Sequence, residues 1–197
     1  MPSPETKALD PIVRFQEWYL EAQRSDKVDP DAMALATCSE DAVPSCRILY
    51  FRKLIGTSFC FFTNYLSHKG QDLGLNQWAS GVFLWHMIGK QLRVEGRVHK
   101  LTPEESDAYF NKRPHESKLS AITSKQSQEL ESYQKFLDEI EKNKRSLGEN
   151  LERPKHWGGY GIEAKKIEFW QKGEHRRHLR ELYIRDDDQW KMTLLYP

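Results

Sequence analysis

The apolar residues near the N-terminus recur with the period of a helix. From Ile12 to Ala22 they are spaced three or four positions apart, which is typical of an amphipathic helix with one face in a core. Asp10 followed by proline marks a helix start, because the carboxylate can cap free backbone N–H groups and proline is tolerated at the first position. We therefore predict a helix from Asp10 to about Ser25, after a flexible tail at residues 1–9.

A different pattern follows between Met33 and Val98, where short runs rich in aliphatic and aromatic residues alternate with turn-forming stretches. Runs of this length and composition are typical of β-strands. Several short strands joined in this way predict a barrel or a sandwich. Turns are expected at Lys53–Thr57 and Ile88–Lys90. The expected strands are Met33–Thr37, Ser45–Phe51, Ser58–Thr63, Gly81–His86 and Gln91–Lys100.

Helical signals return after Lys100. Thr102-Pro103-Glu104-Glu105 is a capping box with proline at the first helical position. We expect that helix to end near Arg113-Pro114, since the residue before a proline disfavours helical backbone. A longer polar helix is expected from Gln128 to Ser146. Its apolar residues form one stripe, which we interpret as core packing: Tyr133, Phe136, Leu137 and Ile140.

The C-terminal end of the chain returns to strands. Trp157–Ile162 and Ile167–Trp170 are expected to be two separate strands. His175–Arg185 and Gln189–Leu195 are expected to form a hairpin around three consecutive aspartates. The whole pattern predicts a mainly β fold with flanking helices, as a single domain over residues 10–197.

Composition narrows the classes of function. The chain has 197 residues, enough to bury a core without disulfides or metal ions. Its net charge of +1, from 30 basic and 29 acidic side chains, lacks the basic excess of nucleic-acid-binding proteins. Three widely spaced cysteines favour neither a disulfide framework nor a zinc site. No apolar run reaches membrane-spanning length and no signal sequence is recognisable, so we expect a cytoplasmic protein that binds neither nucleic acid nor membrane.

The most charged segment lies in the expected C-terminal hairpin, at Glu174–Arg180. Because side chains alternate between the two faces of a strand, Arg176, His178 and Arg180 would share one face. Such a face repels itself unless an anion or carboxylates lie among the cations. The spacing alone leaves two alternatives open, an anion site or a solvated edge strand.

Two other segments carry groups that suit a phosphate. In the first, an apolar strand ends in hydroxyls and cations between Thr63 and Lys69. In the second, Tyr109, Arg113 and Ser117 stand at intervals of four. Taken singly, these segments are better explained as a polar turn and an ordinary helix end. The sequence carries no glycine-rich nucleotide loop and no metal-binding motif, and we expect no metal site.

The order of these segments resembles that of the pyridoxamine 5′-phosphate oxidases, from the first helix to the terminal Tyr196-Pro197. Each block alone is weak evidence, but six blocks in the same order and spacing make the resemblance specific. The blocks are Phe62–Tyr65 with Ser67–Lys69, then Gln91–Gly96, then Tyr109-Phe110 with Arg113-Pro114 and Ser117, then Ser124–Ser127, then Trp157–Tyr160, and last Glu168–Gln171 leading to Arg176, His178 and Arg180.

The resemblance implies an FMN-binding split β-barrel that forms a homodimer with FMN at the subunit interface. Arg47 and Lys69 would neutralise the flavin phosphate, while Trp170 and Arg180 would approach from the partner chain. The positions that match the family's flavin contacts are Arg47, Phe62, Thr63, His68, Lys69, Gln91, Gln126, Ser127, Trp170 and Arg180.

The resemblance also implies a substrate and a reaction. The substrate is a small phosphorylated pyridine, whose C4′ carbon gives a hydride to the flavin; O2 then reoxidises the flavin and yields H2O2. Pyridoxine 5′-phosphate would thus become pyridoxal 5′-phosphate directly, while pyridoxamine 5′-phosphate would give an imine that water hydrolyses to pyridoxal 5′-phosphate and ammonia. Arg176 and His178 would be the catalytic residues over the reacting carbon. They would complete a substrate site whose other members are Arg52, Tyr109, Arg113 and Ser117.

Several positions depart from the family pattern. The family's Arg-Leu-His-Asp-Arg reads Arg-Arg-His-Leu-Arg at residues 176–180. Arg52 replaces a lysine, His68 an arginine and Phe62 a tyrosine. These changes affect substrate choice more than flavin binding. Two alternatives therefore stay open: a related flavin oxidase acting on another small aromatic substrate, as in phenazine biosynthesis, and a non-catalytic binder of flavin or pyridoxal phosphate.

Overall fold

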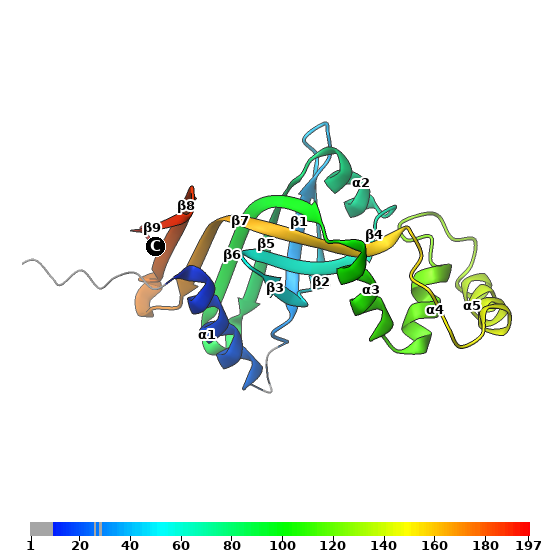
Figure 1. The fold of residues 1–197 in the computed structure, drawn as a ribbon. Helices are drawn as coiled ribbons and strands as arrows, with labels where there is room; N and C mark the ends of the chain where they lie inside the picture. Colours follow the sequence, from blue (N-terminus) through cyan, green and yellow to red (C-terminus); the bar gives the residue numbers. More distant parts are fainter. Residues whose placement is uncertain (1–9, 26, 28) are drawn as a thin grey trace, which may run out of the picture.

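The computed structural model describes residues 10–25, 27 and 29–197. The flexible tail predicted at residues 1–9 lies outside this part of the chain. The described chain is built around one curled antiparallel sheet with helices packed outside it (Figure 1). The prediction of a mainly β fold with flanking helices is confirmed.

The described residues form nine strands in one sheet, in the order β2-β1-β5-β6-β7-β4-β3, with β8 paired to β7 and β9 paired to β8. The predicted strands between Met33 and Val98 are present, but the turn predicted at Lys53–Thr57 contains a short strand of its own, β3. The bounds are β1 (Ala32–Cys38), β2 (Pro44–Tyr50), β3 (Lys53–Ile55), β4 (Ser58–Asn64), β5 (Trp78–Trp85), β6 (Lys90–Lys100), β7 (Trp157–Gln171), β8 (Leu179–Asp186) and β9 (Gln189–Leu194).

The helices begin at capping residues that the sequence supplies. The Asp10 side chain accepts from the backbone N–H groups of Ile12 and Val13, and the predicted capping box of Thr102 and Glu105 is present. Within the described residues, no helix is both long and apolar enough to cross a membrane. The helices are α1 (Pro11–Gln23), α2 (His68–Leu75), α3 (Pro103–Asn111), α4 (His115–Thr123) and α5 (Tyr133–Leu147), with short 3₁₀ turns at η1 (His86–Ile88) and η2 (Glu174–Arg176).

Aromatic side chains fill the inside of the curled sheet, and α1 covers one side of it. Phe15 and Trp18 of α1 are buried. The ring of Phe15 meets that of Phe59 edge-on, with 4.7 Å between the ring centres, and lies 5.7 Å from the ring of Phe83. Burying one such side chain stabilises the fold by about 1.5–3 kcal/mol. The predicted role of α1 in core packing is confirmed.

The longest strand, β7, joins the two ends of the molecule. The sequence predicted two strands here, but one strand runs without interruption from Trp157 to Gln171. Figure 1 shows β7 (orange) running between the end that carries α3 and α4 and the end that carries β8 and β9. Close backbone approach explains the glycines at its start, because a Cβ on residue 158 would lie 2.1 Å from the hydroxyl oxygen of Tyr65.

The apolar stripe of α5 is not part of the core, so that prediction is wrong. No residue of α5 is buried, and the side chain of Tyr133 is 70% exposed. The helix lies outside the sheet and packs beside α4 (Figure 1). The helical spacing of the apolar residues in α5 was predicted correctly, but spacing alone does not show what packs against the apolar face of a helix.

The prediction that Arg176, His178 and Arg180 share one strand face is also wrong. Strand β8 begins only at Leu179, and the preceding residues form the turn η2. His175 and Arg176 both have left-handed backbone, with φ of 52° and 64°, a conformation that interrupts any strand and costs about 1–2 kcal/mol for each non-glycine residue. Arg180 is therefore on a strand, whereas Arg176 and His178 are held by the turn.

Candidate functional site

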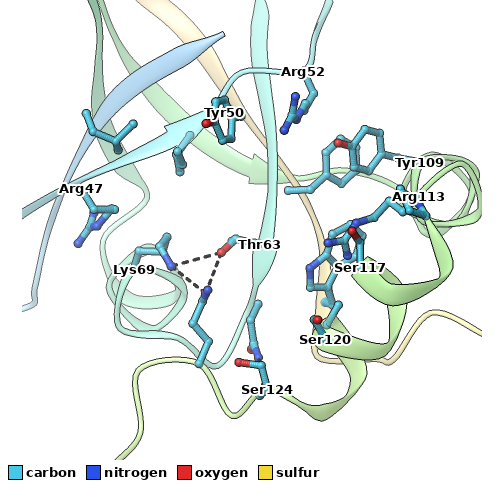
Figure 2. Close-up of a pocket in the computed structure, with 18 of the residues that line it drawn as sticks. Arg47, Tyr50, Arg52, Thr63, Lys69, Tyr109, Arg113, Ser117, Ser120 and Ser124 are labelled. Carbon is cyan, nitrogen blue, oxygen red and sulfur yellow. Dashed lines mark hydrogen bonds between the residues drawn. The ribbon is translucent and has the colours of Figure 1, made fainter. Parts of the chain in front are cut away.

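A cavity of about 710 Å³ lies between β2 and β4 on one side and α3 and α4 on the other. Figure 2 shows its two walls: Arg47, Lys69 and Thr63 on one side, and Tyr109, Arg113 and Ser117 on the other, with Arg52 above them. We refer to these as the Lys69 wall and the Arg113 wall.

The Lys69 wall is formed by the end of β4 and the start of α2. Ser67 caps α2 through a bond from the N–H of Gly70 to its hydroxyl, and this places Lys69 in the first turn. The Lys69 Nζ donates to Gln126 Oε1 at 3.0 Å and to Thr63 Oγ1 at 3.3 Å. Burial lowers the pKa of Lys69 to about 8, with a further contribution from the charge of Arg47. An ammonium with a lowered pKa gains from an anion placed beside it.

The Arg113 wall is formed by the end of α3 and by α4. The rings of Tyr109 and Phe62 stack with 3.8 Å between their centres, and the Arg113 guanidinium lies over the ring of Trp157 at 4.7 Å. The Arg113 Nη1 is buried and has no hydrogen-bond partner among the described residues. Burial is the main reason that the pKa of Arg113 is lowered, and nearby Arg52 lowers it further. A half-buried cation with a buried, unused donor is suited to bind an anion.

The rest of the cavity is polar and cationic. Ser117, Ser120 and Ser124 line it from α4 and its C-terminal cap. The hydroxyls of Ser117 and Ser124 can donate to a phosphate oxygen, whereas the Ser120 hydroxyl already donates to the carbonyl oxygen of Glu116 at 3.0 Å. Arg52 is held at the rim by Asp31, with 3.2 Å between Nη1 and Oδ2, and lies over the ring of Tyr50.

Five cationic side chains line the cavity, and no aspartate or glutamate stands among its lining residues. The cations are Arg47, Arg52, Lys69, Lys112 and Arg113. With aromatic rings on one wall, the cavity is suited to a flat molecule that carries phosphate groups.

A second group of predicted site residues lies at the opposite end of β7. Gln91, Trp170 and Arg180 are paired across β6, β7 and β8, so they form one row in the sheet. The Arg180 Nε donates to the buried Glu168 at 2.8 Å, and this bond raises the pKa of Arg180. Thirteen positions separate Trp170 from Trp157 on β7, a span of up to about 40 Å in an extended strand. The row of Gln91, Trp170 and Arg180 therefore lies far from the cavity of its own chain.

The turn before β8 positions His178 beside that row. The rings of His178 and Trp170 lie 4.5 Å apart, and the N–H of Gly173 donates to His178 Nδ1 at 3.2 Å. Because Nδ1 accepts this bond, the proton of the neutral imidazole belongs on Nε2. Arg176, in the turn, is exposed.

The structure thus divides the sixteen residues predicted from the sequence. His68 lies outside the cavity lining, with its Nε2 3.6 Å from Asp72 Oδ1. Ser127 faces a neighbouring hollow between the 123–131 segment and α5. The residues that line the cavity are Arg47, Arg52, Phe62, Thr63, Lys69, Tyr109, Arg113, Ser117 and Gln126. Those at the far end of β7 are Gln91, Trp170, Arg176, His178 and Arg180.

Several cavity residues were not singled out from the sequence. Trp157 was seen only as part of a block, although it stacks on Phe62 and carries Arg113. Ser120 and Ser124 follow Ser117 at intervals of three and four, a helical spacing that would have placed them on one face had α4 been predicted.

Comparisons with known proteins identify the family to which the chain is similar. A family model described as pyridoxamine 5′-phosphate oxidase matches residues 20–144, and one described as the pyridoxine 5′-phosphate oxidase C-terminal dimerisation region matches residues 157–197. A pyridoxine/pyridoxamine 5′-phosphate oxidase from Ehrlichia ruminantium is 42% identical over 190 residues, covering 95% of this chain and 98% of that protein. One from Leptospira biflexa is 40% identical over 196 residues, covering 99% and 92%.

Solved structures show the same fold. PhzG from Burkholderia lata, solved with tetrahydrophenazine-1-carboxylic acid, is 31% identical and superposes with a TM-score of 0.92, covering 100% of this chain and 98% of that one. A pyridoxamine 5′-phosphate oxidase-related, FMN-binding protein from Nostoc punctiforme is 18% identical with a TM-score of 0.79, covering 96% and 99%, a likeness of fold alone.

Proposed function

The chain belongs to the pyridoxamine 5′-phosphate oxidase family, and from this premise we propose that it oxidises pyridoxamine or pyridoxine 5′-phosphate to pyridoxal 5′-phosphate with FMN and O2. The observation that carries the proposal is the cavity lined by five cations and no carboxylate. Both FMN and the substrate carry a phosphate, and the two walls offer one anion position each.

The residues present fit FMN. The Lys69 wall combines a half-buried ammonium, the Thr63 hydroxyl and Arg47 at the same end of the cavity. These groups would hold the FMN phosphate through charge-assisted bonds, which are roughly twice as strong as neutral ones. When bound, FMN supplies the redox chemistry by taking a hydride from the substrate C4′ and passing two electrons to O2, which leaves as H2O2.

The Arg113 wall would hold the substrate phosphate. The unused Arg113 Nη1 and the hydroxyls of Tyr109 and Ser117 are its donors, and Arg52 is close enough to lower the pKa of Arg113. A phosphate here would satisfy a donor that the protein leaves buried and unpaired. The substrate phosphate would also fix the distance of the pyridine ring from the Lys69 wall, which orients C4′ for transfer.

The remaining site residues would come from a second copy of the chain. The row of Gln91, Trp170 and Arg180 lies at the far end of β7, in the part of the chain that matches the dimerisation region or pairs with it. A two-fold dimer would place this row, with Arg176 and His178, over the partner's cavity. His178 would meet the substrate with its Nε2–H, since Nδ1 is taken by Gly173.

The purified protein tests this proposal through its colour. We expect a flavin spectrum that pyridoxamine 5′-phosphate bleaches without oxygen, and H2O2 with restored colour when air is admitted. Pyridoxamine without its phosphate is the matched control and should bleach the flavin far more slowly. A protein that takes up no FMN, or whose flavin neither phosphorylated vitamer reduces, would contradict the proposal.

The likeness to PhzG over the whole chain favours one second candidate, a flavin oxidase acting on a reduced phenazine carboxylate. Such a substrate has no phosphate for the Arg113 wall. The two functions therefore separate on Arg113→Ala, which should damage turnover of pyridoxamine 5′-phosphate but leave oxidation of a dihydrophenazine carboxylate largely intact. Faster oxidation of the phenazine than of either vitamer by the wild-type protein would favour the second candidate.

A further inference from the structure

Behind the Lys69 wall lies a buried polar pair that does not touch the cavity. Thr37 on β1 and Asp72 on α2 are 3% and 4% exposed. The Thr37 hydroxyl donates to Asp72 Oδ2 at 2.6 Å. A carboxylate only accepts hydrogen bonds, so the single proton of the Thr37 hydroxyl is committed to Asp72, and its lone pairs must face elsewhere.

Those lone pairs face Arg47. The Arg47 Nη1 donates to Thr37 Oγ1 at 2.8 Å and to the carbonyl oxygen of Leu35 at 3.2 Å, while Nη2 donates to Ser45 Oγ. Three of the five guanidinium N–H groups are thus used within the protein. Nε–H and one Nη2–H find no acceptor among the described residues, and Arg47 lines the cavity. The bonds to Thr37, Leu35 and Ser45 fix which edge of the guanidinium stays available.

Asp72 also restrains the other cation of the Lys69 wall. It lies on the same short helix as Lys69, and its bond to Thr37 ties that helix to β1. His68 faces the second carboxylate oxygen, with Nε2 3.6 Å from Oδ1. One buried carboxylate therefore connects both cations, Arg47 through Thr37 and Lys69 through the helix backbone.

We propose that Thr37 and Asp72 are positioning residues for the flavin phosphate, acting through Arg47 and through the placement of α2. The inference rests on the proposed function, since it names the ligand of that site. The change in FMN affinity that we expect is opposite in sign to the change that a purely electrostatic effect would cause. Removing a negative charge near an anion site strengthens anion binding if only Coulomb attraction counts, whereas losing the orientation of Arg47 weakens it.

The test compares FMN with riboflavin, which lacks only the phosphate. Both are titrated into the cofactor-free protein, and binding is followed by quenching of flavin fluorescence. Thr37→Val keeps the shape but removes the hydroxyl, and we expect FMN to bind about tenfold more weakly, the size of one lost hydrogen bond to a charged group. Asp72→Asn keeps the shape but replaces the charged acceptor with a weaker, neutral one, and we expect a loss of about threefold to tenfold. Riboflavin affinity should change in neither variant.

Two controls make the test specific. Thr37→Ser retains the hydroxyl and should bind FMN like the wild type. Asp107→Asn removes an exposed carboxylate of α3 that pairs with Arg153 and should change neither affinity. Thermal melting shows which variants fold; if Thr37→Val does not, Asp72→Asn decides.

Three results would overturn the inference: unchanged FMN affinity in Asp72→Asn, tighter FMN binding in that variant, or equal losses for FMN and riboflavin, which would indicate a general structural role. A wild-type protein that does not prefer FMN to riboflavin gives a different failure. That result contradicts the phosphate site of the proposed function itself.

Discussion

The cavity and the turn before β8 differ in how much of a site one chain completes. Around the cavity, three half-buried cations, Arg47, Lys69 and Arg113, face one space, and Arg113 keeps a buried donor without a partner among the described residues. At the turn, residues 174–177 are exposed and strained backbone holds them in place. The cavity is prepared for anions within the chain, whereas the turn presents its side chains outward. This difference supports the proposal that the turn serves the cavity of a second copy.

The largest effect is expected from a substitution that damages the cavity and leaves the turn before β8 intact. Arg113→Ala removes the half-buried cation of the Arg113 wall, and kcat/KM for pyridoxamine 5′-phosphate should fall roughly tenfold to hundredfold, as for a lost charged hydrogen bond. The residual activity on unphosphorylated pyridoxamine should not change, because the lost contact is to the phosphate. Lys118→Ala on the neighbouring helix α4 is the control, since Lys118 packs over Phe110 and does not line the cavity. Equal losses on both substrates would show that Arg113 serves the fold and not the phosphate.

The second prediction concerns a substitution that distorts the turn before β8 and leaves the cavity intact. A Cβ on residue 173 would lie 2.0 Å from the carbonyl oxygen of Arg177, so Gly173→Ala must move the backbone that holds His178. We expect anaerobic flavin reduction to slow about tenfold or more, since small misplacements of reacting groups have effects of this size. FMN affinity should be retained, because the phosphate contacts belong to the cavity. In Gly74→Ala the new Cβ meets open space, and reduction there should match the wild type. Unchanged reduction in Gly173→Ala would remove the turn from the site.

The smallest predicted effect concerns pH and sharpens the description of the Lys69 wall. Lys69 has a pKa of about 8 in the free protein, and a bound phosphate favours its protonated form. As pH rises above this value the free protein loses that proton, so FMN affinity should decline, approaching tenfold per pH unit at most. The phosphate is fully ionised throughout this range, since its second pKa is about 6.

Lys69→Arg is the matched variant for this prediction, because arginine keeps its charge over the whole range. Its FMN affinity should stay level between about pH 7.5 and pH 9.5, measured by fluorescence titration. A decline of equal steepness in Lys69→Arg would assign the pH dependence to another group.

The sequence predicted the parts of the fold that are fixed locally. The runs that form β1, β2, β4, β5 and β6 and the capped starts of α1 and α3 were identified, because apolar period and capping residues act over a few positions. The short helices α2 and α4 were missed. Each has only eight or nine residues, and helices of that length owe their stability to tertiary packing more than to their own sequence.

The C-terminal site residues show a different limit. The strand-face argument for Arg176 and His178 failed because no glycine marks the left-handed positions at His175 and Arg176, where non-glycine residues are rare. The apolar stripe of α5 likewise predicted a helix, but it did not show which part of the molecule packs against that helix. Nine of the sixteen predicted site residues nevertheless line one cavity, because their places in the site were taken from the family resemblance. Spacing and composition alone do not bring them together.

The central claim is that each site is built from two chains, and subunit mixing tests it most directly. Arg113→Ala and His178→Ala each damage one half of the site and should both be poorly active alone. When the two variants are mixed and allowed to exchange subunits, a mixed dimer holds one site with both halves intact. Random exchange in a two-fold dimer should therefore restore roughly a quarter of the wild-type activity. If every site lies within one chain, each remains damaged and mixing restores nothing, which would contradict the account.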